Sequence, residues 1–535
     1  MTDRDRQRQP PAPPALAASL PQAVPWKTWV GVMGTILGAF MAVLDIQITN
    51  ASLKEIQAAL GATLEEGSWI STAYLVAEIV VIPLTGWLAT VFSIRRYLLV
   101  NAALFIVFSM GCAWAWNLPS MIGFRAAQGF TGGTLIPLAF TFILQNLPPA
   151  KQPIGLAMFA ITATFAPSIG PTLGGWLTEN YGWQYIFYLN VIPGLLLLSA
   201  VWYAVEPGRM NLHLLKQGDW GGIIAMAIGL GSLQVVLEEG SRKDWFDSAL
   251  IVRLSAIAVI FLSLFFWLEL TRKRPFIELR LLKRRNFALA NTVNIALGIG
   301  LYGSIYILPL YLAQIQGYNA LQIGEVIMWV GLPQLLIVPL VPFLMKKIDA
   351  RLMVGVGVSL FAISCFMNSN LTHQTGLDQL RWSQLVRAAG QPLIMVPLSS
   401  IATVGIEPAL AGSASALFNM MRNLGGSLGI ATLATLLNNR EQFHSSRLGE
   451  SISIYSPETQ QRLEQLTQLL MERGGVDWNT AHQQALATID NLVRREALVM
   501  AYNDCFYFIG MTLLLSAIAV LFFNKVESTG GSAVH

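Results

Sequence analysis

The sequence has little charge, few cysteines and no motif of the common soluble enzyme classes. Charged residues occupy 12% of the 535 positions and hydrophobic residues 54%, which excludes an ordinary soluble protein of this length. Cys112, Cys365 and Cys505 lie in apolar runs without CxxC or metal-ligand spacing, so we interpret them as small buried hydrophobes. Neither a GxxxxGK phosphate loop nor HExxH occurs. We therefore expect no enzyme activity, cofactor, metal site or nucleic-acid partner.

What the sequence does contain is a series of fourteen long apolar segments. Their lengths of roughly 19 to 28 residues fit tilted transmembrane helices, whereas membrane barrel strands need only about 9 to 11 alternating residues. We predict a spanning helix for each segment, a disordered cytoplasmic tail at 1–27 and a second cytoplasmic tail at 525–535. The predicted helices lie near residues 28–52, 69–90, 97–116, 120–145, 154–177, 185–205, 220–238, 248–270, 287–312, 321–345, 352–371, 380–404, 409–436 and 498–524.

Lysine and arginine are distributed unevenly among the loops. With a cytoplasmic N-terminus, the short inside loops and tails carry about twenty of them and the short outside loops about four. This bias predicts a bacterial inner-membrane protein with both termini in the cytoplasm. The polar segment 437–497 is then periplasmic. Helical spacing of Leu463, Leu466, Leu469 and Leu470 predicts an amphipathic hairpin there, although a simple connector fits the segment equally well.

Three short passages recur in the same order in the two halves of the chain. PLTGWLATVFSIRR at Pro83 is echoed by PLVPFLMKKIDAR at Pro339, RAAQG at Arg125 by RAAGQ at Arg387, and one LGG by another, with offsets of 256, 262 and 251 residues. Three echoes in one order and at nearly one offset indicate a duplication. Duplicated helical halves around a midplane site are typical of alternating-access transporters.

The repeat also predicts the domain organisation of an all-α polytopic membrane protein. Six helices form a first half at 28–205 and six form a second half at 287–524, which includes the periplasmic segment 437–497. The remaining two helices form an insertion within 206–286.

Ionisable residues inside the predicted helices are functional candidates, because a charge at that depth costs several kcal/mol. Asp45 lies on a polar stripe of the first helix, Glu78 lies near the middle of the second, and Arg125 lies in the fourth at a depth similar to that of Asp45. A carboxyl group beside a fixed guanidinium is a simple proton carrier. We predict that these three residues couple transport to protons; a purely structural polar contact is the alternative.

Other polar and aromatic side chains are candidates for a substrate cavity. Asn419 and Arg422 share a stripe of the thirteenth helix, and Tyr74 lies on the polar stripe of the second. Tyr306 and Trp329 are weaker candidates, since core or interface packing fits them as well. Because buried arginines outnumber the acids left for cargo, the sequence predicts a neutral or weakly acidic substrate rather than a permanent cation.

Three motifs resemble those of the drug:proton antiporters of the major facilitator superfamily, specifically the fourteen-helix EmrB type. LDIQITNASL is similar to the helix-one motif, RAAQGFTGG to the helix-four motif and APSIGPTLGGWL to the helix-five antiporter motif. The resemblance covers residues 28–524 and implies the major facilitator fold. It also implies that Asp45 is the proton-linked acid and that Arg125 and Gln128 take part in coupling.

The helix-five motif implies a set of conformational residues. Prolines and small residues permit a kink and near backbone contact, which suits two halves that rock on each other. The residues that match the motif are Gly170, Pro171, Gly174 and Gly175.

The loop motif between the second and third helices departs from the family pattern GxLaDrxGrr. In GWLATVFSIRR, Thr90 replaces the acid and Ser93 replaces the second glycine, whereas Gly86, Arg95 and Arg96 remain. The conformational latch that the family attributes to this acid is therefore in doubt here.

The resemblance implies a proton-coupled exporter of lipophilic drugs or toxic compounds in the inner membrane. EmrB-type pumps work with a periplasmic adaptor of the EmrA type and an outer-membrane channel, so the resemblance implies both partners, besides protons and membrane lipid. The alternative within transport is a dedicated exporter of one metabolite, such as a siderophore or a fatty acid.

Overall fold

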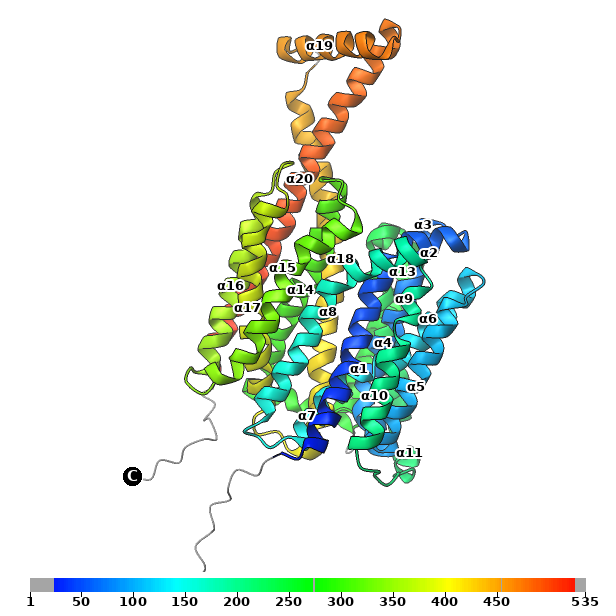
Figure 1. The fold of residues 1–535 in the computed structure, drawn as a ribbon, viewed down its shortest axis with the longest axis vertical. Coiled ribbons are helices and arrows are strands. Elements are labelled where there is room, and N and C mark those ends of the chain that lie inside the picture. Colours follow the sequence, from blue (N-terminus) through cyan, green and yellow to red (C-terminus); the bar gives the residue numbers. More distant parts are fainter. Residues whose placement is uncertain (1–23, 273–274, 454, 525–535) are drawn as a thin grey trace, which may run out of the picture.

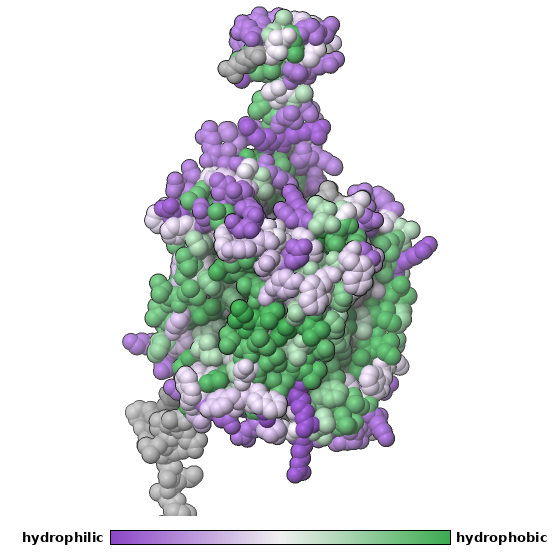
Figure 2. Space-filling view, turned by 45° about the vertical axis from the view of Figure 1, so that its right-hand side comes forward, coloured by the Kyte–Doolittle hydropathy of each residue, from purple (hydrophilic) through white to green (hydrophobic). Residues whose placement is uncertain are grey.

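The computed structural model describes residues 24–272, 275–453 and 455–524, which form a bundle of long helices without any strand (Figure 1). The two predicted tails lie outside the described residues apart from 24–27. On the face seen in Figure 2, hydrophobic side chains form a broad band across the bundle, and hydrophilic ones gather above and below that band. This distribution is the one expected where lipid is the solvent.

Helices form at all of the predicted apolar segments. Thirteen helical stretches in the described part are long and apolar enough to cross a membrane. α18 covers the remaining predicted segment; it is more polar, yet it packs within the bundle against α14, α20 and α4. The long helices are α1 (Trp26–Ala51), α4 (Trp69–Phe92), α5 (Ile94–Ala113), α8 (Gln152–Tyr181), α12 (Trp220–Glu239), α13 (Ala249–Thr271), α14 (Arg285–Gln314), α15 (Ala320–Leu344), α16 (Ala350–Met367), α17 (Leu377–Thr403), α18 (Ala411–Ser451) and α20 (Trp478–Leu521).

Two predicted segments are each divided into two helices. The segment near 120–145 forms α6 (Leu118–Gly132) and α7 (Leu135–Asn146), and the segment near 185–205 forms α9 (Tyr185–Tyr188) and α10 (Val191–Ala204). Both interruptions are shorter than hydropathy can resolve. The second one has a functional consequence, because it places a polar residue beside Asp45. Shorter helices in the connections are α2 (Leu53–Leu60), α3 (Leu64–Gly67) and α11 (His213–Gln217).

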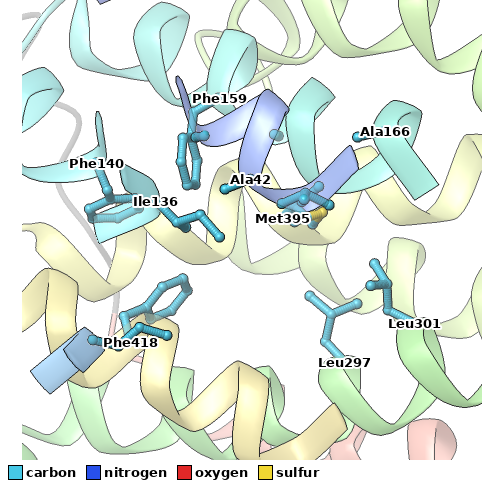
Figure 3. Packing of buried hydrophobic residues seen from close by; sticks show 14 of the residues in the cluster. Ala42, Ile136, Phe140, Phe159, Ala166, Leu297, Leu301, Met395 and Phe418 are labelled. Carbon is cyan, nitrogen blue, oxygen red and sulfur yellow. The ribbon is translucent and has the colours of Figure 1, made fainter. Parts of the chain in front are cut away.

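The two halves meet mainly where α8 and α18 pack on helices of the opposite half. α8 of the first half packs against α15 and α17 of the second, and α18 of the second half packs against α4 and α7 of the first. Gly86 and Gly412 allow α4 and α18 to touch, since a Cβ on Gly86 would lie 2.7 Å from the Gly412 carbonyl carbon. The rings of Phe140 and Phe418 stack across the same interface, with centroids 5.8 Å apart (Figure 3). Apolar packing therefore fills this part of the contact between the halves.

The inserted helix α12 bridges the two halves. Near its C-terminal end, Glu239 accepts hydrogen bonds from Ser68 Oγ at 3.0 Å and from Thr72 Oγ1 at 2.7 Å, beside and within α4. Gln234, on the same helix, donates to Ser427 Oγ of α18 at 2.8 Å. α13 packs against α12, and only 17% of its most apolar stretch is buried inside the protein. Most of the α13 surface therefore faces lipid.

The segment 437–497 is helical and continues the membrane helices. α18 and α20 extend beyond the bundle, and α19 (Pro457–Gly474) lies across their tips (Figure 1). α19 packs on α20, with Leu463, Leu466 and Leu470 partly buried and Leu469 42% exposed. We refer to residues 437–497 as the hairpin from here on.

A tight turn at Ser93 joins α4 to α5. Ser93 has φ 67° and ψ 143°, a region of backbone conformation that is almost restricted to glycine. This is the position at which the family pattern has glycine and this sequence does not. The chain therefore keeps the turn geometry at a cost in strain.

Replacing Ser93 with glycine should raise the melting temperature of the purified protein. The strain costs about 1–3 kcal/mol, of which the greater chain entropy of glycine offsets about 0.5–1 kcal/mol. Gly182 has a similar backbone conformation, with φ 103° and ψ 157°, and provides the reverse control: Gly182→Ser should lower the melting temperature. Thermal unfolding of both variants in detergent tests this account, and a lower melting temperature for Ser93→Gly would contradict it.

Candidate functional site

A buried ion pair joins α1 to α6. Nη1 of Arg125 lies 2.5 Å from Oδ2 of Asp45, and each side chain is 1% exposed. Removing two charges from water costs several kcal/mol per ion, so such a pair persists only with good geometry and additional hydrogen bonds. The structure brings together the two residues that the sequence placed at a similar depth.

Neutral amides complete the contacts of the Asp45 carboxylate. Oδ1 accepts from Gln128 Nε2 at 2.9 Å and from Asn190 Nδ2 at 2.6 Å. Gln128 also accepts from Nη1 of Arg125 at 2.8 Å. Asn190 in turn donates to Ser109 Oγ at 3.0 Å. Both carboxylate oxygens are therefore held, by two donors from α6 and one from the turn between α9 and α10.

Asn190 is a functional candidate that the sequence analysis missed. It lies in the interruption between α9 and α10, 2% exposed, where the chain turns towards Asp45. The available signal was a lone amide within the apolar run YLNVIPG, since a polar side chain at membrane depth needs a partner.

Aromatic rings enclose the guanidinium of Arg125. Its Cζ lies 4.3 Å from the ring centroid of Tyr74 and 5.9 Å from that of Phe187, and its Nε donates to the Ile70 carbonyl oxygen at 3.3 Å. Tyr74 is fully buried and donates to the Ala42 carbonyl oxygen at 3.4 Å. This candidate for the substrate cavity therefore lies beneath the arginine of the ion pair.

In this arrangement, protonation of Asp45 can change how the surrounding helices pack. Protonation of Asp45 would cancel one charge of the pair and leave the Arg125 cation without its counter-charge in a dry site. Because α1, α4, α6 and the α9–α10 turn all contribute contacts, the energetic penalty would act on several helices at once. We call Asp45, Arg125, Gln128 and Asn190 the ion-pair site.

Glu78 and Arg422 face each other from opposite halves. Glu78 of α4 is 4% exposed and Arg422 of α18 is also 4% exposed. Their opposite charges attract each other across the interface, without a direct ion pair between the two side chains. Arg422 donates from Nη2 to Asn419 Oδ1 at 2.8 Å, so these two cavity candidates adjoin each other near the interface.

The other two cavity candidates lie elsewhere. Tyr306 of α14 has Arg242 and Glu238 as charged neighbours, near the end of the inserted helix α12. Trp329 of α15 lies under the guanidinium of Arg381, whose Cζ is 4.6 Å from the ring centroid. The structure thus does not bring Tyr306 and Trp329 to the ion-pair site.

The residues of the helix-five motif pack α8 on α1. A Cβ on Gly170 would lie 2.5 Å from Gln47 Cβ, and one on Gly174 would lie 3.0 Å from the Ile48 carbonyl oxygen. Pro171 and Gly175 lie in the same stretch of α8, which remains one helix through both of its interior prolines, Pro167 and Pro171. The motif therefore keeps α8 close to the helix that carries Asp45.

The residues of the loop motif perform separate structural roles. Gly86 forms the crossing with Gly412 described above. Arg95 stacks on Trp202 with its Cζ 4.7 Å from the ring centroid and donates to the Trp202 carbonyl oxygen at 2.8 Å, whereas Arg96 is exposed. Thr90 donates to the Gly86 carbonyl oxygen at 3.0 Å, so it remains bonded to its own helix.

The expectation that no motif of the soluble enzyme classes occurs is wrong at one place, where a hydrolase pattern lies in the wrong structural context. GGSLG at 425–429 matches GxSxG, but the segment lies within α18. The nucleophile elbow of that pattern requires a sharp turn from strand to helix. Here the glycines instead admit α14, since a Cβ on Gly425 would clash with the Ile295 backbone.

Known proteins with similar sequences are membrane transporters, in agreement with the fold. Residues 35–430 match the Major Facilitator Superfamily. The chain is 34% identical to the colistin resistance protein EmrB of Acinetobacter baumannii, over 94% of this chain and 97% of that one. It is 32% identical to the multidrug export protein EmrB of Escherichia coli (93% and 96% covered) and 31% identical to the fatty acid resistance protein FarB of Neisseria gonorrhoeae (93% and 96% covered).

Solved structures share the fold at low identity. The proton:xylose symporter XylE gives a TM-score of 0.59 at 13% identity, over 93% of this chain and 96% of that one. The human organic anion transporter MFSD10 gives 0.56 at 13% identity, over 92% and 99%. The predicted all-helical major facilitator fold is confirmed. The chain belongs to the Major Facilitator Superfamily and, within it, to the EmrB-type drug transporters.

Proposed function

We propose that this protein is a proton-coupled antiporter that exports lipophilic, neutral or weakly acidic compounds. The observation that carries the proposal is the ion-pair site: a fully buried carboxylate held by one guanidinium and two amides. A buried charge is retained at membrane depth where it serves function. Asp45 takes the proton, Arg125 and Gln128 respond to its charge, and Glu78 is a second acid on the interface between the halves.

Two observations support the proposed substrate class: the names of the similar proteins and the excess of buried arginines. Similar proteins are named for colistin resistance, multidrug export and fatty acid resistance, a range that favours export of varied lipophilic compounds. The second candidate function is dedicated export of one metabolite, and the resemblance to FarB favours a fatty acid for that role.

We place the protein in the bacterial inner membrane with both termini in the cytoplasm. The support is the excess of lysine and arginine in the loops on that side. The hairpin then projects into the periplasm. Its length beyond the bundle suits a contact with a periplasmic adaptor of the EmrA type, which would continue the path to an outer-membrane channel (Figure 1).

Asp45→Asn should abolish efflux driven by a pH gradient and leave substrate exchange without a gradient intact. The amide cannot carry a proton through the cycle, although it preserves the shape of the side chain. Efflux and counterflow of a labelled lipophilic substrate in proteoliposomes measure the two activities. Asp378→Asn is the matched control, because the Asp378 side chain is 84% exposed at the start of α17. Wild-type gradient-driven efflux in Asp45→Asn would refute the role of Asp45.

Because Asp45→Asn leaves Arg125 without a counter-charge, loss of folding must be distinguished from loss of coupling. The double variant Asp45→Asn/Arg125→Gln removes both charges and should restore the melting temperature without restoring gradient-driven efflux. Recovery of efflux in the double variant would instead show that the pair has only a structural role.

Replacing residues 452–476 with a Gly–Ser linker of equal length should eliminate drug resistance in cells and preserve transport in proteoliposomes. The replacement removes α19 but keeps Asp477, whose Oδ2 caps α20 by accepting from Thr480 N at 3.3 Å. Transport in proteoliposomes requires only the bundle, whereas resistance requires delivery beyond the periplasm. Minimum inhibitory concentrations measured at equal expression check this prediction, and wild-type resistance would exclude an adaptor role for α19.

A further inference from the structure

Three arginines are buried among the described residues, and they differ in their counter-charges. Arg125 is paired with Asp45 at 2.5 Å. Within the described part of the chain Arg422 forms no direct ion pair, but it has the opposite charge of Glu78 near it across the interface. Arg387 of α17 is 6% exposed, and no carboxylate of the described residues lies within ion-pair distance of its guanidinium. It is the repeat counterpart of Arg125 without a counterpart of Asp45.

Neutral groups surround Arg387 and leave its charge uncompensated. In the amide orientation that satisfies both side chains, Gln391 Oε1 accepts from Arg387 Nε at 2.9 Å and from Nη2 at 3.3 Å. In that orientation the Gln391 amide nitrogen lies 2.7 Å from the Gln334 amide nitrogen. The Phe361 ring centroid is 5.4 Å from Cζ of Arg387. A guanidinium has five N–H donors, so Gln391 occupies only part of this capacity. A cation in this position lowers its energy by binding an anion.

The guanidinium lines a small pocket between the two halves. α8 of the first half contributes Thr164 and Ser168 to the wall, and α17 of the second contributes Arg387 and Gln391. By helical rise, Arg387 lies about 15 Å along α17 and Thr164 about 18 Å along α8, which places the pocket close to half-way along both helices. This is the depth at which alternating-access transporters hold their cargo.

The rest of the wall is apolar. Leu301 and Ile305 of α14 and Ile327 and Val330 of α15 line the pocket, and Leu301 lies on the central packing seen in Figure 3. One fixed cation within an apolar wall matches the shape of an amphiphilic anion, in which one charged end adjoins a hydrocarbon part. Guanidinium binds a carboxylate through two parallel hydrogen bonds, which an alcohol cannot form.

We propose that Arg387, positioned by Gln391, is the anion-binding residue of the substrate site, and that the preferred cargo is the ionised form of a lipophilic carboxylic acid. The inference rests on the proposed export function and narrows its substrate class. In this conformation the pocket has room for about one water molecule, so the head group binds when the halves move apart around Arg387, with the hydrocarbon part along α14 and α15. Arg125 cannot take this role, because Asp45 already supplies its counter-charge.

The test compares three ligands of one chain length: decanoate, decanol and decyltrimethylammonium. Binding to the purified protein in lipid nanodiscs is measured at neutral pH, with empty nanodiscs to subtract partition into lipid. Wild type should bind decanoate at least tenfold more tightly than decanol, and decyltrimethylammonium most weakly. Arg387→Gln should bring decanoate to the affinity of decanol without changing decanol, while Arg387→Lys should retain part of the preference.

Arg381→Gln is the matched control, since Arg381 lies on the same helix, is 39% exposed and pairs with Asp378; it should keep the wild-type preference. A decanoate preference that survives in Arg387→Gln, or is absent in wild type, overturns the inference. Gradient-driven efflux of all three ligands by the same proteins distinguishes failure of this inference from failure of the proposed function. Efflux without an anion preference in binding rejects this site alone, whereas no efflux of any of the three rejects the export function.

Discussion

A charge inside a membrane needs an opposite charge or hydrogen-bond partners, and the packing around Asp45 and Arg125 depends on this requirement. Asp45 and Arg125 meet that requirement for each other, and Gln128 and Asn190 satisfy the remaining carboxylate oxygen. The chain places small residues around the pair to make this possible. A Cβ on Gly129 would lie 2.3 Å from the Tyr74 carbonyl oxygen, so α6 and α4 can approach only where glycine stands.

The same requirement distinguishes the two halves. Although the halves repeat the RAA sequence, the first half supplies an internal counter-charge and the second does not. The repeated passage thus stands in two different settings: a closed ion pair in the first half and a cation without a carboxylate partner beside the interface in the second.

Much of the fold could be predicted from the sequence, because each membrane-spanning helix is visible as an apolar run of about 20 residues. The pairing of Asp45 with Arg125 could also be predicted, because each lies on a polar stripe and helical rise sets their depth. The interruption at Asn190 could not, since one turn of backbone leaves no trace in an average over about 20 residues. The approach of Glu78 to Arg422 depends on how the two halves pack, which no local pattern records.

The hairpin has a mechanical consequence. α18 and α20 are continuous from inside the bundle to its far tip, so the hairpin is a rigid extension of the second half and not a separate tethered module. About 20 residues of α20 precede its apolar part, which corresponds to a lever of about 30 Å. Each degree by which the second half tilts therefore displaces the tip by about half an ångström. The motion of the transport cycle is thereby transmitted to whatever rests on α19.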